Sequence, residues 1–227
     1  MKCQLFQDYP FEIKNPSKII DIMSVRVKVC GITRCEDAQA AVQLGVDAIG
    51  FVFWQQSARY IDPDSARRIA ANIPPFVCAV GVYVNPDAAW VEETSKVAKL
   101  NLLQFHGDET PEFCNQFYQP YIKALRVKQD TDLLQYAERY KTAKALLLDT
   151  YAADMPGGTG HTFNWQLIPQ YLPLPLILSG GLNPDNVAMA IQQTQPWAVD
   201  VSSGVEASKG IKDEKKIFAF MQGVKQL

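Results

Sequence analysis

Two residues of this sequence could carry acid–base chemistry, and each stands at the end of a predicted strand. Cys30 ends an alternating run of valines and polar residues at 25–30, and Asp149 ends the apolar run ALLLD at 145–149. A carboxyl group at a partly desolvated strand end can donate a proton near neutral pH. A thiol at the carboxyl end of a strand, just before a βα turn, stands where α/β barrels keep their reactive groups. The alternatives are structural: a small buried cysteine, and a carboxylate that caps the following loop.

Glycines and small hydroxyl residues gather after the last three predicted strands. The segments are 155–160 (MPGGTG), 179–181 (SGG) and 202–204 (SSG). Glycine exposes backbone N–H groups to a ligand, and hydroxyls add donors, which is what a phosphate group requires. Tight turns are the alternative. The sequence has no GxxxxGK[ST] motif, so it predicts a site for one phosphate rather than for a nucleoside triphosphate. The candidate phosphate-binding residues are Gly158, Gly160, Gly180, Gly181, Ser202, Ser203 and Gly204.

Three further residues could contact a substrate. Arg59 follows the second predicted strand, and its guanidinium group could bind a substrate carboxylate, although a solvated surface arginine would look the same. His106 ends the run LLQFH and could contact a ligand or anchor its loop. Asp200 lies between apolar neighbours and could orient a substrate group or brace the loop that follows it.

Alternating strands and helices must position these residues. Apolar, β-rich runs predict strands at about 26–30, 47–53, 77–84, 101–105, 121–127, 145–149, 175–179 and 197–201. Amphipathic stretches predict helices at about 34–44, 63–72, 86–98, 110–117, 131–140, 164–171, 184–193 and 212–224. Near-continuously apolar strands that alternate with helices are typical of a parallel sheet covered by helices. Eight such units favour an α/β fold with a single (βα)8 TIM barrel over an open sheet.

Several predicted helices begin with residues that favour a helix start. Thr33 could cap the first helix, which runs to about Leu44, with Glu36 completing a capping box. A cap residue followed by proline begins three further helices, and an aspartate or threonine could cap the fifth. These candidate caps are Asp62-Pro63, Asn85-Pro86, Asn183-Pro184, and Asp130 or Thr131.

The composition excludes several classes of partner. The 227 residues are 48% hydrophobic and carry a formal net charge of -2, which gives no reason to expect a nucleic acid or an anionic membrane as partner. The five cysteines contain no CxxC pair and indicate a reducing cytoplasm rather than disulfides. The two histidines have no ligand-like spacing, so we expect no metal site. No apolar run reaches the roughly 18 residues of a membrane span.

Residues 1–24 differ in composition from the rest of the chain. They hold two prolines and several charges without a continuous apolar core, which excludes a secretory signal. We expect Met23 to be the natural start and residues 1–22 to be an upstream extension; the alternative is an arm packed on the bottom of the barrel. The expected organisation is therefore an N-terminal extension at 1–24 and a catalytic (βα)8-barrel domain at 25–227.

Taken in order, the motifs resemble the phosphoribosylanthranilate isomerase family, barrel enzymes of tryptophan biosynthesis. The matching stretches are KVCGIT (28–33), LGVDAIGFVF (44–53), SARY (57–60), VGVYVN (80–85), LLQFHGDE (102–109), LLLDT (146–150), GGTGHTFNW (157–165), LSGGLNP (178–184) and DVSSGVE (200–206). They extend over residues 25 to 227 and include nearly every predicted strand end. The N-terminal extension is outside the resemblance.

The resemblance implies an Amadori rearrangement of N-(5-phosphoribosyl)anthranilate to 1-(2-carboxyphenylamino)-1-deoxyribulose 5-phosphate, without a cofactor. It implies that Asp149 is the general acid that opens the furanose ring and that Cys30 is the general base that removes the C2′ proton. For this role Cys30 must be at least partly thiolate, and Lys28, on the same strand face, could favour that form. Arg59 would hold the anthranilate carboxylate, while His106 and Asp200 would line the pocket. The phosphate would lie against Gly158, Gly160, Gly181, Ser203 and Gly204. The expected partner is this phosphosugar substrate, and we expect a monomer rather than a homodimer.

Two positions depart from the family pattern, and two other functions compete with this one. Asn164 stands where many members have aspartate, a mild change because asparagine also caps helices. Ala58 stands where many have proline, which could loosen the loop that carries Arg59. A related histidine-pathway aminoaldose isomerase is the first alternative, but such enzymes use paired aspartates where this chain has Cys30. A catalytically idle barrel that binds a phosphorylated metabolite is the second, and it would need neither Cys30 nor Asp149.

Overall fold

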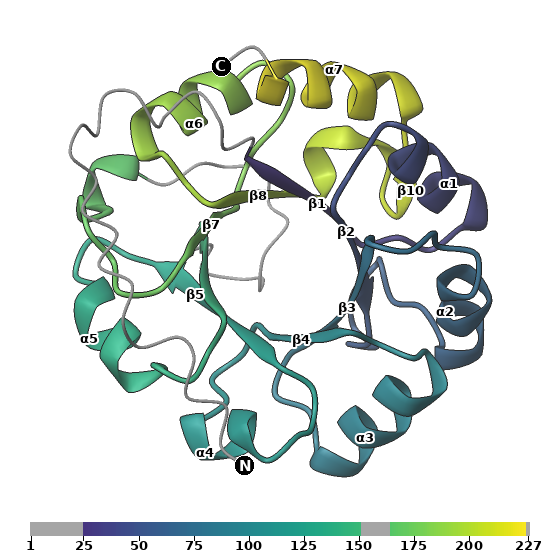
Figure 1. The fold of residues 1–227 in the computed structure, drawn as a ribbon, viewed down its shortest axis with the longest axis horizontal. Helices are drawn as coiled ribbons and strands as arrows, with labels where there is room; N and C mark the ends of the chain where they lie inside the picture. Colours follow the sequence, from purple (N-terminus) through teal and green to yellow (C-terminus); the bar gives the residue numbers. More distant parts are fainter. Residues whose placement is uncertain (1–24, 151–163, 226–227) are drawn as a thin grey trace, which may run out of the picture.

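Eight parallel strands close into a barrel in which each strand pairs with its neighbours in the sequence and the first pairs with the last (Figure 1). The computed structural model describes residues 25–150 and 164–225. The strands are β1 (Arg26–Cys30), β2 (Ala48–Val52), β3 (Cys78–Tyr83), β4 (Leu102–Phe105), β5 (Tyr121–Val127), β6 (Ala145–Thr150), β7 (Leu176–Leu178) and β8 (Ala198–Val201). The predicted (βα)8 barrel is therefore confirmed, and every strand begins and ends within about one residue of its expected bounds.

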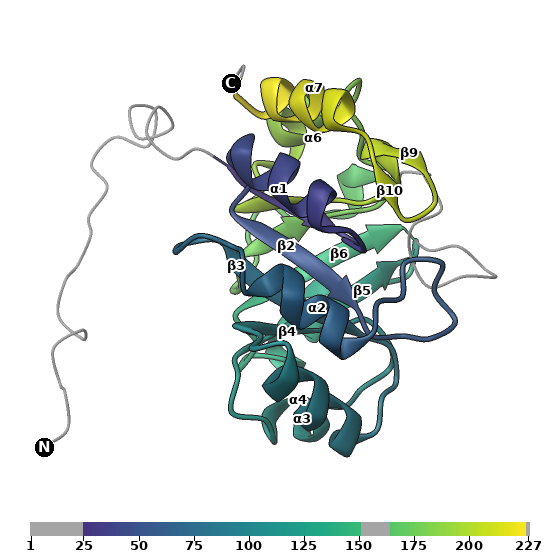
Figure 2. The ribbon, with the colours of Figure 1, turned by 90° about the vertical axis from the view of Figure 1, so that its right-hand side faces the viewer.

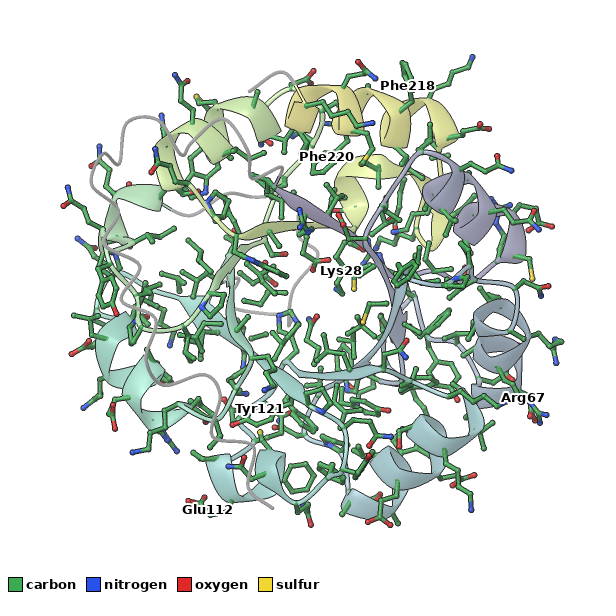
Figure 3. The ribbon with its side chains drawn as sticks, viewed as in Figure 1. Lys28, Arg67, Glu112, Tyr121, Phe218 and Phe220 are labelled. Carbon is green, nitrogen blue, oxygen red and sulfur yellow. The ribbon has the colours of Figure 1, made fainter. Side chains whose placement is uncertain are left out.

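Helices surround this barrel and bury one face each against the strands. Within the described residues they are α1 (Cys35–Gln43), α2 (Pro63–Ala70), α3 (Ala88–Val97), α4 (Pro111–Asn115), α5 (Leu133–Arg139), α6 (Val187–Thr194) and α7 (Glu214–Lys225) (Figure 1). Figure 2 shows from the side how α1, α2 and α3 cover the strands. The helix α7 shows the pattern: Phe220 is buried in the main core, whereas Phe218 is exposed on the outer face (Figure 3). No described helix has the length and apolar character needed to cross a membrane.

The stretch 164–171, which we expected to be a full helix, forms only the short 3₁₀-helix η2 (Trp165–Leu167). Pro169 explains the difference, because a proline inside a helix lacks the N–H donor and clashes with the preceding turn. The expected cap is nevertheless present: the side chain of Asn164 accepts a hydrogen bond of 3.0 Å from the backbone N–H of Gln166.

The predicted capping box before α1 is wrong. Arg34 occupies the N-cap position and makes no side-chain cap hydrogen bond. The Thr33 hydroxyl instead donates to the backbone carbonyl of Gly210 at 2.6 Å. Gly210 lies in the turn of a small antiparallel hairpin formed by β9 (Glu206–Ser208) and β10 (Ile211–Lys212). The loop after β1 is thereby attached to the segment after β8, which brings two parts of the predicted site together.

Other helices begin at a different cap from the expected one. Asp62 caps α2 as predicted, by accepting a 2.9 Å hydrogen bond from the backbone N–H of Ser65. For α3 and α5, however, the caps are Asp87 and Asp132. Aspartate, asparagine and threonine are all good caps, so neighbouring candidates cannot be ranked by residue type alone. The expected caps that these helices and α6 do not use are Asn85, Asp130, Thr131 and Asn183.

Polarity changes along the inside of the barrel. Side chains alternate between the barrel interior and the helix layer, and a buried apolar cluster fills the interior near the strand starts. Its members are Leu102, Ile122, Ala124, Ala145, Leu147, Ile177 and Ala198. Two residues further along their strands come polar groups, at Gln104, Asp149, Ser179 and Asp200. On β1 the same alternation gives Lys28, which lies inside the ring of strands in Figure 3, and then Cys30. The polar residues that were predicted to form a site are thus at the carboxyl end of the barrel, where (βα)8 enzymes have their active sites.

Candidate active site

Cys30 lies in a narrow, mostly apolar space at the carboxyl end of β1. Its side chain is 8% exposed and belongs to a small cluster with Val52 and Val82, against which Trp54 packs. Gly50 is paired with Cys30 on the neighbouring strand β2. A Cβ atom at Gly50 would lie 2.9 Å from the sulfur, closer than van der Waals contact permits. The glycine therefore provides the room that the thiol occupies.

Charged neighbours act on the Cys30 thiol in opposite directions. Lys28 Nζ donates to Asp200 Oδ1 at 2.8 Å, and both side chains are buried. Burial raises the pKa of the Cys30 thiol, and the charge of Asp200 raises it further, whereas Lys28 and Lys212 lower it. Lys28 thus acts in the direction that the sequence suggests, but burial outweighs it. The net effect of these neighbours is a pKa of Cys30 above the ordinary value of a thiol.

Arg59 is held by an acidic partner that is distant in the sequence. Its Nε and Nη2 donate to the two carboxylate oxygens of Glu206 at 2.7 and 2.8 Å. Lys212 Nζ donates to the same carboxylate at 2.9 Å. Gly31, with φ of +75°, lets the arginine pass close to the backbone, because a Cβ there would lie 2.6 Å from Arg59 Cδ. With a side chain only 15% exposed, Arg59 is not the solvated surface residue of the alternative interpretation.

Asp149 and His106 meet at the mouth of the barrel. Asp149 is the penultimate residue of β6. Its carboxylate is buried, and Oδ2 lies 3.1 Å from His106 Nε2. Its Oδ1 accepts a 2.8 Å hydrogen bond from the backbone N–H of Thr150. On the other side of the imidazole, Nδ1 lies 3.1 Å from Nε2 of Gln104. Two of the predicted site residues are therefore in direct contact, and the histidine is a partner of the carboxylate.

The glycine loops after β7 and β8 lie against each other. Gly180 and Gly181 have φ of +83° and +65°, a conformation that favours glycine. A Cβ at Gly180 would overlap Thr150, which places this loop beside the end of β6. A Cβ at Gly204 would overlap the carbonyl of Leu182. The two loops that were expected to hold a phosphate are thus adjacent, with their glycines at the contacts.

The two serines of the loop after β8 differ in their surroundings. The Ser202 hydroxyl donates to the backbone carbonyl of Cys30 at 3.0 Å, so it links the end of β8 to the end of β1. Ser203 begins the 3₁₀-helix η3 (Ser203–Val205) directly after it. The other predicted phosphate residues, Gly158 and Gly160, lie outside the described residues, as does the extension at 1–24.

Reasoning from sequence assigned no role to three residues of this site: Gln104, Glu206 and Lys212. Gln104 and Glu206 stand inside the motifs LLQFHGDE and DVSSGVE, so a signal was present. The spacing of residues in the sequence does not predict which side chains Gln104 and Glu206 contact, because Arg59 and Glu206, for example, are 147 residues apart. Lys212 lies in β10, whereas it was expected to begin the last helix.

The arrangement defines a class of protein before any comparison is made. A buried thiol and a buried carboxylate stand on strands separated by β7 and β8, at the same end of a closed barrel, with glycine loops beside them. This is the arrangement of a (βα)8-barrel enzyme, with two groups that could carry acid–base chemistry beside loops that could hold a phosphate. In residues 25–150 and 164–225, no three His, Cys, Asp or Glu side chains are grouped so that they could hold a metal ion.

Comparison with known proteins narrows this class to one family. Residues 27–223 match the family model of N-(5′-phosphoribosyl)anthranilate isomerase. The N-(5′-phosphoribosyl)anthranilate isomerase of Nitrosospira multiformis is 68% identical over 202 residues, which cover 89% of this chain and 97% of that protein. The corresponding protein of Nitrosomonas europaea is 65% identical over 203 residues, covering 89% and 96%. The crystal structure of the Thermotoga maritima enzyme shares 45% identity and a TM-score of 0.82, covering 89% of this chain and all of that one.

This chain belongs to the phosphoribosylanthranilate isomerase family. Membership confirms the resemblance seen in the motifs and makes the protein an isomerase of tryptophan biosynthesis. A second crystal structure of a phosphoribosylanthranilate isomerase, with 44% identity and a TM-score of 0.79, contains reduced 1-(o-carboxyphenylamino)-1-deoxyribulose 5-phosphate. That enzyme therefore binds a phosphosugar in the same fold.

Proposed function

We propose that the enzyme rearranges N-(5-phosphoribosyl)anthranilate to 1-(2-carboxyphenylamino)-1-deoxyribulose 5-phosphate, with Asp149 as general acid and Cys30 as general base. The observation that carries the proposal is the placement of one buried carboxyl and one buried thiol at the same end of the barrel. An acid and a base on different strands can act on opposite sides of a sugar bound between them.

In the first step, Asp149 opens the ring. Its O–H bond breaks as the proton joins the furanose oxygen, the C1′–O bond breaks, and the lone pair of the anthranilate nitrogen forms a C1′=N bond. The product is a cationic Schiff base, and Asp149 is left as a carboxylate. The backbone N–H of Thr150 and the imidazole of His106, which contact its two oxygens, would stabilise that carboxylate.

In the second step, the thiolate of Cys30 removes the C2′ proton. The electrons of the C–H bond form a C1′=C2′ bond, and the electron pair of the C=N bond returns to nitrogen. The resulting enolamine tautomerises: its hydroxyl loses a proton while C1′ gains one. Burial raises the pKa of the thiol in the free enzyme, so the thiolate forms only when the S–H proton passes to solvent water. The positive charge of the Schiff base formed in the first step lowers the pKa of the nearby thiol, so the thiolate forms once the sugar ring has opened.

Binding would be divided between Arg59 and the glycine loops. Arg59 pairs with Glu206 through Nε and Nη2, so Nη1 is the nitrogen positioned for the anthranilate carboxylate. The loops of Gly181 and Gly204 supply backbone donors for the phosphate. Asp200, whose carboxylate accepts a hydrogen bond from Lys28, would line the pocket.

The test follows the fluorescence decay of phosphoribosylanthranilate, generated in situ, with wild type, Cys30→Ser and Asp149→Ala. We expect rapid decay with wild type and a kcat about 10²–10⁴-fold lower in each variant, with substrate binding retained. Cys35→Ser is the matched control, because Cys35 is an exposed thiol on α1 and should not affect turnover. Wild-type turnover in either active-site variant would overturn its assigned role. Absence of decay with the folded wild type would favour the metabolite-binding barrel.

We also infer a monomer that works in the cytoplasm. The large exposed apolar side chains come from separate elements, for example Phe76, Tyr118 and Phe218, rather than from one helix face. The cysteines in the described part of the chain are all free thiols, as in a reducing compartment. The Thermotoga maritima enzyme is described as dimeric, so sedimentation analysis of this chain decides the point.

A further inference from the structure

Gln104 is a fully buried residue that the reaction steps leave without a role. It lies on β4 with its side chain inside the barrel, between Val82 of β3 and Ile122 of β5 in the register. Its Nε2 lies 3.1 Å from His106 Nδ1. Its Oε1 is buried and has no hydrogen-bond partner in the described ranges of the chain. A buried amide oxygen without a partner is unusual and needs an explanation. Here the contact with His106 is the interaction that orients the amide.

This contact determines which imidazole nitrogen carries the proton. An amide nitrogen can only donate, so Nδ1 of a neutral His106 must accept and the proton must reside on Nε2. Nε2 faces Oδ2 of Asp149 at 3.1 Å, while the backbone N–H of Thr150 donates to Oδ1 at 2.8 Å. Both carboxyl oxygens of Asp149 therefore receive a donor.

We propose that Gln104 is a positioning residue that holds His106 in the tautomer with its proton on Nε2 and thereby directs the proton of Asp149 toward the substrate. In the opposite tautomer, Nε2 would present a lone pair and accept that proton, which would then point at the imidazole instead of the furanose oxygen. With Nε2 protonated, His106 cannot accept it. When the O–H bond of Asp149 breaks and the proton joins the ring oxygen, the same N–H stabilises the remaining carboxylate. The inference rests on the acid role proposed for Asp149.

The tautomer can be measured directly, because the chain contains only two histidines, His106 and His161. Long-range ¹H–¹⁵N correlation spectra of ¹⁵N-labelled protein distinguish a protonated from an unprotonated imidazole nitrogen. The spectrum of His161→Gln assigns the signals. We expect the proton of His106 on Nε2 at neutral pH. A proton on Nδ1 in the wild type, or one on each nitrogen, would overturn the proposal without reference to any activity.

Two substitutions of similar length test whether Gln104 sets this state. Gln104→Glu replaces the donor with an acceptor and should bring a proton onto Nδ1, whereas Gln104→Met removes both polar groups. We expect kcat to fall about tenfold or more in each, with KM changed less than about twofold, because the substrate contacts remain. An unchanged His106 spectrum in Gln104→Glu, or wild-type turnover in Gln104→Met, would overturn the proposal. Near-normal turnover of Asp149→Ala would refute the acid assignment itself, which separates that failure from a failure at Gln104.

Discussion

Replacing Asp200 with asparagine should make the Cys30 thiol ionise at lower pH. The charge of Asp200 raises the pKa of Cys30, whereas Lys28, held 2.8 Å from Asp200, lowers it. An unbalanced charge within about 4–6 Å shifts a pKa by about one to three units. The pH at which Cys30 is half ionised should therefore fall by about that much in Asp200→Asn. Lys28→Met should move it upward, because Asp200 then acts without the opposing lysine.

The assay is alkylation of Cys30 by iodoacetamide as a function of pH, since the thiolate is the reactive form. Trypsin cuts after Lys28 and Arg34, so the peptide VCGITR contains Cys30 alone and can be followed by mass spectrometry. In Lys28→Met the first cut falls after Arg26, and the peptide followed is VMVCGITR. The exposed thiol of Cys35 serves as an internal reference. At a pH below both midpoints, Asp200→Asn should be alkylated about 10 to 1000 times faster than wild type. If both variants shifted in the same direction, or neither did, the electrostatic account of Cys30 would be wrong.

The same two variants should lose stability, because each leaves a buried charge without its partner. The side chains of Lys28 and Asp200 are 6% and 5% exposed. Removing one member of a buried pair costs about 3–5 kcal/mol, whereas replacing both by apolar residues is often neutral. Urea unfolding should therefore show a loss of about 3–5 kcal/mol in Lys28→Met and a recovery of most of it in Lys28→Met/Asp200→Leu. A double variant that is less stable than both single variants would contradict this reasoning.

Three other outcomes can be checked with single variants. Arg59→Ala should raise KM with a smaller effect on kcat, and steady-state kinetics with an unchanged KM would remove its binding role. Gly50→Ala should displace the Cys30 sulfur, since the new Cβ would lie 2.9 Å from it, and lower kcat by up to about 100-fold; normal turnover would show that the site adapts. Lys123→Met should lower the free energy of unfolding in urea by about 3–5 kcal/mol, because it leaves the buried carboxylate of Glu109, 2.7 Å from Lys123 Nζ, without its charged partner. A decrease below about 1 kcal/mol would contradict this account of the pair.

The strands and the two proposed catalytic residues could be predicted because the signal is local. In the run ALLLD, four apolar residues fix a buried strand, and the one polar residue at its end must face a partner or a ligand. Cys30 follows the same rule on β1. Both lie at the carboxyl ends of their strands, as predicted, and both are buried.

The remaining features depend on closure of the barrel or on competition between neighbouring residues. Arg59 meets Glu206 only because the loop after β2 and the hairpin after β8 lie beside β1, and no spacing in the sequence encodes that contact. The residues that begin some of the helices could not be predicted for a different reason: neighbouring residues compete for the cap position. Asn85 adopts φ of +46° and accepts from the backbone N–H of Asp108, so it serves the neighbouring loop while Asp87 caps α3.

The two ends of the barrel interior divide stability and chemistry between them. Apolar side chains fill the end where the strands begin, and their burial stabilises the fold. At the carboxyl end, buried charges stand in pairs, such as Lys28 with Asp200 and Arg59 with Glu206. A buried ion pair is no more stabilising than a well-packed apolar pair, so stability does not explain why these charges are there. Their role is electrostatic: Lys28 and Asp200 shift the pKa of the Cys30 thiol, and Glu206 holds the guanidinium group of Arg59 in place. Replacing a whole pair by apolar residues should therefore preserve the barrel and remove its activity.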